Sequence, residues 1–177
     1  QKGGVGKTTT TVNIAAALAK SGFEVLVVDI DPQGNASTAL GVDHRSEVPS
    51  VYDVLINDRP MSEIVVPCPD LERLVVAPAT IDLAGAEIEL VSLVAREQRL
   101  RRALEDYEAY RKKKKLPRLD FVLVDCPPSL GLLTVNAFVA AREVLIPIQC
   151  EYYALEGLSQ LLKNIQMIQK HLNAALV

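Results

Sequence analysis

The chain has 177 residues, 49% of them hydrophobic and 23% charged, and its 19 basic and 22 acidic side chains leave a formal net charge of −3. This balance is typical of one folded domain and argues against disorder or bulk-charge coating of nucleic acid. No apolar run reaches the roughly 18 residues that span a bilayer, and no signal-peptide pattern is present. The cysteines Cys68, Cys126 and Cys150 fit neither a disulfide framework nor a metal-ligand spacing, which favours thiols in a cytoplasmic protein.

A glycine-rich segment opens the chain, and a helix is predicted directly after it, over Thr8–Ser21. Glycines allow positive φ, so backbone N–H groups can turn inward around a polyphosphate while the helix N-terminus faces the same anion. Lys7 adds a cation for the β- and γ-phosphates, and the Thr8 hydroxyl is placed to bind Mg²⁺. The predicted ATP phosphate-binding residues are Lys2, Gly3, Gly4, Val5, Gly6, Lys7, Thr8 and Thr9.

The first apolar strand is predicted over Phe23–Ile30, and the sequence continues Asp31-Pro32-Gln33-Gly34. Ligand sites of parallel α/β sheets open at the carboxyl ends of strands, where Asp29 and Asp31 fall. Pro32 disfavours a helical conformation at Asp31, so the chain should leave the strand in an extended turn. We assign Asp31 to orienting the attacking water, and Asp31 with Pro32 to a switch segment; the alternative is that both aspartates only cap the turn.

Further strands are predicted over Leu74–Ala77 and Phe121–Cys126, with a helical stretch within Ile81–Tyr110 between them. Asp125 ends the second of these strands in the manner of a Walker B aspartate, which holds Mg²⁺ directly or through a water together with Thr8. The following Cys126-Pro127-Pro128 forms a stiff turn suited to sensing the γ-phosphate, so Asp125 and Pro127 are predicted as switch residues.

The last predicted elements are a helix over Ser129–Ala141, a strand over Val144–Gln149 and an amphipathic helix over Ala154–Leu176. Continuous apolar strands alternating with helices indicate right-handed crossovers. The sequence therefore predicts an α/β fold: a mostly parallel sheet covered by helices on both faces, in three layers. A composition break at Arg111–Lys115 is interpreted as a solvated helix end rather than a DNA-binding patch.

Four segments in this order, KGGVGKTT, VVDIDPQGN, FVLVDCPPS and EYYALEG, resemble the ParA (Soj) branch of partitioning ATPases. Lys2 stands where the deviant Walker A loop of the ParA/MinD group has its signature lysine, which reaches across a dimer to the partner's phosphates. The resemblance implies a P-loop NTPase fold, with residues 1–177 as one ATPase domain that lacks its first strand and its C-terminal third.

The same resemblance implies a slow, Mg²⁺-dependent ATPase in the cytoplasm, associated with the nucleoid. It would form an ATP-dependent homodimer that binds double-stranded DNA nonspecifically, and a ParB-type centromere-binding protein would trigger hydrolysis. Lys2, Lys7 and Asp31 would be the catalytic residues.

Two other functions stay open. One is a MinD-like ATPase that positions the division site on a membrane, although the predicted last helix carries too few basic groups for a convincing membrane face. The other is a synthetase that couples ATP to a metabolic substrate, for which the sequence offers no recognisable acceptor-binding residues.

Overall fold

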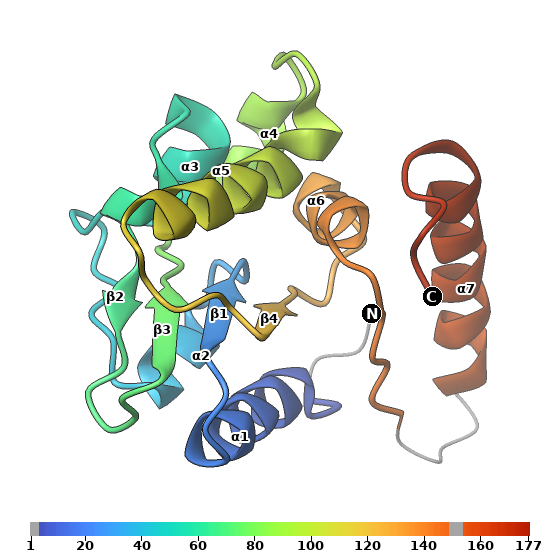
Figure 1. The fold of residues 1–177 in the computed structure, drawn as a ribbon. Helices are drawn as coiled ribbons and strands as arrows, with labels where there is room; N and C mark the ends of the chain where they lie inside the picture. The colour runs from blue at the N-terminus through green and yellow to red at the C-terminus, as the bar shows by residue number, and fades with distance from the viewer. Residues whose placement is uncertain (1–3, 149–153) are drawn as a thin grey trace.

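The computed structural model describes residues 4–148 and 154–177. Its helices are α1 (Lys7–Lys20), α2 (Asn35–Ala39), α3 (Val51–Asn57), α4 (Leu83–Leu90), α5 (Arg99–Lys113), α6 (Leu132–Ala140) and α7 (Ala154–His171), with short 3₁₀ turns at Met61–Glu63 and Arg96–Gln98. Its strands are β1 (Val25–Asp29), β2 (Val66–Pro67), β3 (Leu74–Ala77) and β4 (Phe121–Asp125). Figure 1 shows how these elements are arranged.

The described strands form one sheet in the order β2-β3-β1-β4. β1 pairs in parallel with both β3 and β4, and only the short β2 runs antiparallel to its neighbour. Every residue of β1 is buried, as expected for a central strand covered on both faces. The register aligns Asp29 with Asp125, so the carboxyl ends of β1 and β4 meet at one edge of the sheet.

Helices lie on both faces of the sheet (Figure 1), and a hydrophobic cluster fills the space between each helical layer and the sheet. On one face, Leu26 and Val28 pack with α3, α4, α5 and α6. On the other, Val25 and Val27 pack with α1 and α2. Alternate side chains of one strand thus serve opposite layers. The predicted α/β class, a mostly parallel sheet between two helical layers, is confirmed.

The predicted helical stretch within Ile81–Tyr110 is divided into α4 and α5. Ala95 has φ +51°, which a right-handed helix does not tolerate, and the Arg96 guanidinium donates to the Val91 carbonyl at the end of α4. α3 was not predicted, although its N-terminus carries a capping box. The Asp53 carboxylate accepts from Ser50 N–H, and the Ser50 side chain accepts from backbone N–H in the first turn of the helix.

The predicted strand over Val144–Gln149 is wrong for its described part, residues 144–148, which form no strand. A strand exists only through a ladder to a neighbour, and in residues 4–148 and 154–177 the one strand paired with β4 is β1. Residues near the start of this segment instead bond to the chain end: Val144 N–H donates to the Val177 carbonyl, and Val177 N–H donates to the Arg142 carbonyl, both at 2.8 Å.

The C-terminal helix α7 packs beside α6 through a third, smaller cluster that includes Phe138, Ile165 and Ile168. The buried Asn173 side chain fixes this contact, because its amide donates to the carbonyls of Phe138, Val139 and Ala141 at the end of α6. Within the part of the chain described, no helix is both long and apolar enough to cross a membrane.

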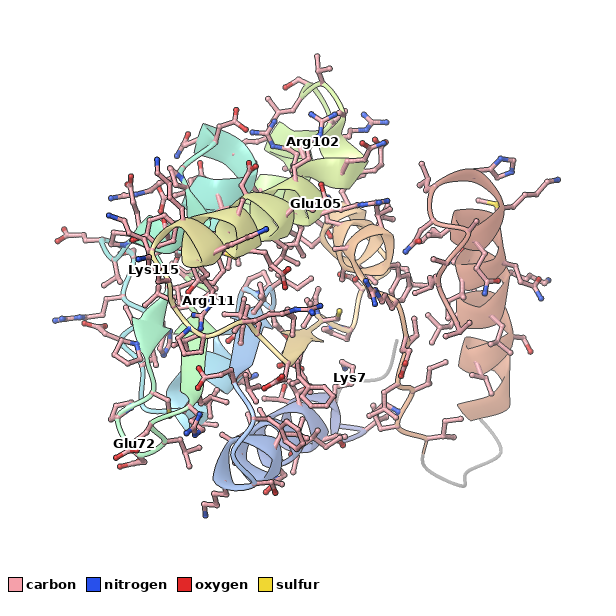
Figure 2. All side chains as sticks on the ribbon, in the orientation of Figure 1. Lys7, Glu72, Arg102, Glu105, Arg111 and Lys115 are labelled. Carbon is pink, nitrogen blue, oxygen red and sulfur yellow. The ribbon has the colours of Figure 1, made fainter. Side chains whose placement is uncertain are left out.

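Charged side chains follow the outer side of α5 (Figure 2). Arg111 is buried at its C-terminal end, where it donates to the Pro117 carbonyl and lies 3.6 Å from a Glu24 carboxylate oxygen. Lys112, Lys113 and Lys115 are exposed around this end. Cations at a helix C-terminus are favourable. The predicted solvated helix end is confirmed for the lysines, whereas Arg111 of the same run is buried.

Asn136 offers a test of how α5 and α6 are held together. Its fully buried amide accepts from Leu100 N–H and donates to the carbonyls of Arg96 and Leu132. Asn136→Ala leaves these groups unpaired, so we expect the free energy of unfolding to fall by about 3 kcal/mol in urea denaturation. Asn57→Ala, which removes one exposed bond of 3.4 Å, is the control, and equal losses from both variants would contradict this account.

Candidate functional site

The glycine-rich loop enters α1 with left-handed backbone at two positions. Gly4 has φ +81° and Gly6 has φ +89°, and Gly6 is the N-cap residue of α1. Both conformations are costly for residues with a Cβ, which explains why glycine stands there. Lys7 begins the helix, and Figure 2 labels it beside α1 and β4. Lys2 and Gly3, predicted for the same loop, lie outside the described residues.

Two hydroxyl groups of α1 bind the carboxylate that ends β4. Thr8 Oγ1 donates to Asp125 Oδ2 at 2.7 Å. Thr11 Oγ1 lies 3.3 Å from Asp125 Oδ1 and 3.1 Å from the Lys7 carbonyl, so its one proton is shared between these two acceptors. The two threonines are three residues apart and so share one helix face. Thr8 and Asp125 were predicted to act together, and the structure brings them together. Thr11 was missed, although its spacing from Thr8 is a signal that could have found it.

Opposing effects act on the pKa of Asp125, which is raised overall. Burial raises the pKa of this carboxyl, the hydroxyls of Thr8 and Thr11 lower it, the charge of Asp31 raises it and that of Lys7 lowers it. Lys7 and Asp31 are therefore near enough to influence Asp125 from the loop and from the end of β1. Three of the predicted functional side chains thus share one electrostatic environment.

Asp29 anchors the segment that follows β1. Its Oδ2 accepts from both the N–H and the hydroxyl of Ser37, at 2.8 and 2.7 Å, and its Oδ1 accepts from Asp31 N–H. Burial raises the pKa of Asp29 to about 6, against the lowering effect of Ser37, and the charge of Asp125 raises it further. Both oxygens of Asp29 accept hydrogen bonds from the segment that follows it, so Asp29 holds the position of Asp31. The sequence analysis did not identify Ser37 as a site residue.

Asp31 begins a tight turn. Its Oδ1 accepts from Gln33 N–H at 3.0 Å and its carbonyl accepts from Gly34 N–H at 2.9 Å. Such a turn places an aspartate beyond the strand end, as Pro32 predicted. Gly34 has φ +62° and lies under the ring of His44, which bonds to Thr38 at 2.8 Å.

A cavity of about 230 Å³ opens beside this turn. Asp31 and Pro32 line it from the segment after β1, and Pro127 and Pro128 line it from the segment after β4. All four predicted switch residues, Asp31, Pro32, Asp125 and Pro127, therefore lie at the adjoining ends of β1 and β4 or in the wall of this cavity.

Cys126 lies between Asp125 and these prolines. Burial raises the pKa of its thiol to about 12, and the charge of Asp125 adds to the shift. The thiol therefore stays protonated at neutral pH and is a poor nucleophile or metal ligand. Cys68 is also a free, buried thiol, which donates to the Leu40 carbonyl.

The donor set fits Mg²⁺ held together with phosphates. No group of three or more His, Cys, Asp or Glu side chains suited to a metal ion occurs in residues 4–148 and 154–177. The paired Thr8 hydroxyl and Asp125 carboxylate supply the oxygen donors that Mg²⁺ prefers, and this ion commonly completes its shell with phosphate oxygens and waters.

Gly34 tests the geometry of the turn. A Cβ at this position would lie 2.7 Å from His44 Nδ1, whereas a Cβ at Gly22, with φ +94°, would meet open space. We expect Gly34→Ala to lower the free energy of unfolding by about 2 kcal/mol and Gly22→Ala by about 1 kcal/mol, because only the first adds a clash to the backbone cost. Adding His44→Ala should recover the difference in a double-mutant cycle, and equal costs at the two glycines would refute the close approach.

Comparisons with known sequences agree with this geometry. All of residues 1–177 match the AAA domain family. The chain is 54% identical over 177 residues to the sporulation initiation inhibitor protein Soj of Bacillus subtilis (strain 168), covering 100% of this chain and 66% of Soj. It is 53% identical over 173 residues to the chromosome partitioning protein ParA of Myxococcus xanthus (strain DK1622), covering 98% of this chain and 58% of ParA. The chain thus spans less than two thirds of the length of either relative.

Solved structures share the fold. A cobyrinic acid a,c-diamide synthase from Mycobacterium smegmatis, with bound ATP analogue and magnesium, superposes with a TM-score of 0.87 at 43% identity, covering 99% of this chain and 68% of that one. A plasmid partition protein from Borrelia burgdorferi gives a TM-score of 0.80 at 21% identity, covering 99% and 71%, which is a likeness of fold alone. From its loop, its paired strand ends and the family model that matches all of it, the chain belongs to the AAA domain family, and its sequence is similar to those of the Soj and ParA proteins.

Proposed function

We propose that this chain is the nucleotide-binding core of a DNA-partitioning ATPase, which hydrolyses ATP to ADP and phosphate. The observation that carries the proposal is the contact of Thr8 Oγ1 with Asp125 Oδ2 at 2.7 Å, beside a glycine loop and a helix N-terminus. This contact joins a hydroxyl and a carboxylate where a nucleotide's phosphates would meet a magnesium ion. The curated relatives at 53–54% identity are named as partitioning and sporulation-control proteins.

In this proposal, backbone N–H groups from Gly3 to Thr9 hold the phosphates and Lys7 neutralises the β- and γ-phosphates. Thr8 binds Mg²⁺ and Asp125 binds it directly or through a water, with Thr11 orienting the carboxylate. The ion would withdraw charge from the phosphate oxygens. Lys7 and the loop amides stabilise negative charge on the phosphoryl group as it transfers.

Asp31 is proposed to hold the attacking water in line with the γ-phosphate. Its turn is braced on both sides, because its own N–H donates to Asp29 and its carboxylate accepts from Gln33 N–H. One Asp31 oxygen therefore fixes the turn while the other can accept from a water. Loss of the γ-phosphate would change the conformation of this turn and of the segment at Pro127. The two segments would in this way act as the switch.

The assembly is also part of the proposal. Lys2 of one subunit would reach the phosphates of its partner in an ATP-bound homodimer, so that catalysis depends on assembly. The dimer would bind double-stranded DNA nonspecifically on the nucleoid, and a ParB-type protein would stimulate hydrolysis and so release it.

A fluorescence anisotropy titration of a random-sequence DNA duplex tests the proposed function, with ATP, with ADP and without nucleotide, over a salt series. We expect binding only with ATP, weakening steeply with salt because counterions are released. Absence of binding in every state would refute partitioning. Binding to anionic liposomes instead would favour the MinD-like alternative, which the named relatives do not favour.

Lys7→Ala tests the phosphate loop. Removing this cation should weaken ATP binding by about 100-fold, because charge-assisted hydrogen bonds to phosphate are worth roughly 1.5–3 kcal/mol. Lys20→Ala, at the exposed other end of α1, is the matched control and should bind ATP like the parent. Isothermal titration calorimetry measures both, and unchanged affinity in Lys7→Ala would exclude Lys7 from the site.

Asp31→Ala tests the water-orienting role. We expect hydrolysis to slow by on the order of 100-fold while ATP remains bound, so that the variant accumulates as an ATP-bound dimer. Single-turnover hydrolysis and analytical ultracentrifugation measure the two effects, with Asp70→Ala on the exposed surface as control. Hydrolysis at the parental rate in Asp31→Ala would remove Asp31 from this role.

A further inference from the structure

Glu87 of α4 is an exception among the buried polar groups. Its Oε1 is the one buried side-chain oxygen or nitrogen in the described part of the chain that has no hydrogen-bond partner. Leaving a buried carboxylate oxygen without a donor costs free energy, so such a group calls for a physical reason. Glu89 on the same helix, by contrast, accepts from the Tyr52 hydroxyl at 3.0 Å. The missing donor is therefore particular to Glu87.

The Glu87 carboxylate lies against the start of α6. Gly131 is the N-cap residue of this helix, and a Cβ added there would overlap both oxygens of the carboxylate. Any other residue at this position would push the two elements apart. Glu87 and the N-terminus of α6 can therefore approach each other only because residue 131 has no side chain.

The N-terminus of α6 has donors to offer. The first four N–H groups of a helix have no acceptor within it, and among the described residues no side chain caps α6. Its first turn also contains no acidic residue that would interact with the positive end of the helix dipole. Glu87 brings a negative charge to this end from another helix. An acceptor without a donor thus lies beside donors for which the helix provides no acceptor.

This end of α6 carries the segment that follows β4. Thr134 Oγ1 donates to the Ser129 carbonyl at 2.7 Å, which fastens that segment to the first turn of the helix. Residues 127–129 line the cavity of about 230 Å³, together with Asp31 from the end of β1 and Glu87 from α4. The position of the α6 N-terminus therefore determines how residues 127–129 face Asp31.

We propose that Glu87 is a positioning residue of the ATPase. In the conformation that hydrolyses ATP, its carboxylate accepts from the first-turn N–H groups of α6 at Leu132 and Leu133 and so holds residues 127–129 in place opposite Asp31. The carboxylate and these donors attract each other, so a small displacement of the segment gives Oε1 its missing partner. The inference rests on the proposed function, because it concerns the segment that faces the water-orienting aspartate.

Amide hydrogen exchange followed by NMR tests the contact itself. With Mg²⁺ and a non-hydrolysable ATP analogue, exchange at Leu132 and Leu133 should be about tenfold slower in the parent than in Glu87→Ala, because an accepted N–H is protected. Glu87→Gln keeps an acceptor oxygen and should recover most of this protection. Glu89→Gln, which changes an exposed acid of the same helix, is the matched control and should exchange like the parent.

Single-turnover hydrolysis, calorimetry and urea unfolding separate positioning from binding and from folding. Glu87→Ala should hydrolyse ATP about tenfold more slowly with an ATP affinity within about twofold of the parent's, and Glu87→Gln should recover most of the rate. Gly131→Ala should slow hydrolysis in the parent but by less than about twofold in the Glu87→Ala background, where its Cβ has nothing to displace. The urea midpoint of Glu87→Ala should be no lower than the parent's, because the oxygen removed has no donor.

Each outcome decides the proposal. Parental exchange or parental hydrolysis in Glu87→Ala overturns it, and so do additive losses from Gly131→Ala and Glu87→Ala. A lower urea midpoint in Glu87→Ala, with no recovery of the rate in Glu87→Gln, would give the residue a merely structural role and contradict the proposal. Failure of the parent to bind ATP would reject the ATPase proposal as well, whereas hydrolysis by the parent that Glu87→Ala leaves unchanged rejects this inference alone.

Discussion

The parallel pairing of β1 with β4 aligns two buried carboxylates, Asp29 and Asp125, at the same edge of the sheet. Burial raises the pKa of both carboxyls, and the charge of Asp125 raises that of Asp29 further, so this edge would be destabilised without compensating donors. Each acid therefore receives donors from a different element, Asp29 from the segment after β1 and Asp125 from α1. The same contacts that make this edge stable also hold the glycine loop and the Asp31 turn against each other, which is the arrangement a phosphate site needs.

This edge also connects the phosphate loop to the outer surface. From Asp125 the chain passes through two prolines to Gly131, the N-cap of α6, which lies against Glu87 of α4. From Asp29 it passes to the turn that lines the same cavity. The cavity therefore brings residues from the ends of β1 and β4 next to α4.

Local patterns predicted most of the fold and the centre of the candidate site. The glycine loop, α1, and the carboxylates after β1 and β4 each follow from a few adjacent residues, so Lys7, Asp31 and Asp125 could be found without the structure. Ser37, which anchors Asp29, could not easily be found, because its role depends on a contact made across the fold. Thr11 was missed although it follows Thr8 by three residues and so shares its helix face. The strand expected over Val144–Gln149 failed in its described part, residues 144–148, for a related reason. Apolar residues favour a strand, but only a neighbouring strand completes one, and no described strand pairs with this segment.

The central claim, that the Thr8–Asp125 contact marks the site of a magnesium nucleotide, is tested most directly by anomalous scattering from Mn²⁺. Crystals of the protein grown with Mn²⁺ and a non-hydrolysable ATP analogue would locate the ion. The account predicts one strong peak bound to the Thr8 hydroxyl and to phosphate oxygens, with Asp125 bound directly or through a water. A peak remote from Thr8 and Asp125, or a nucleotide bound with its phosphates away from the loop at Gly4 and Gly6, would contradict it.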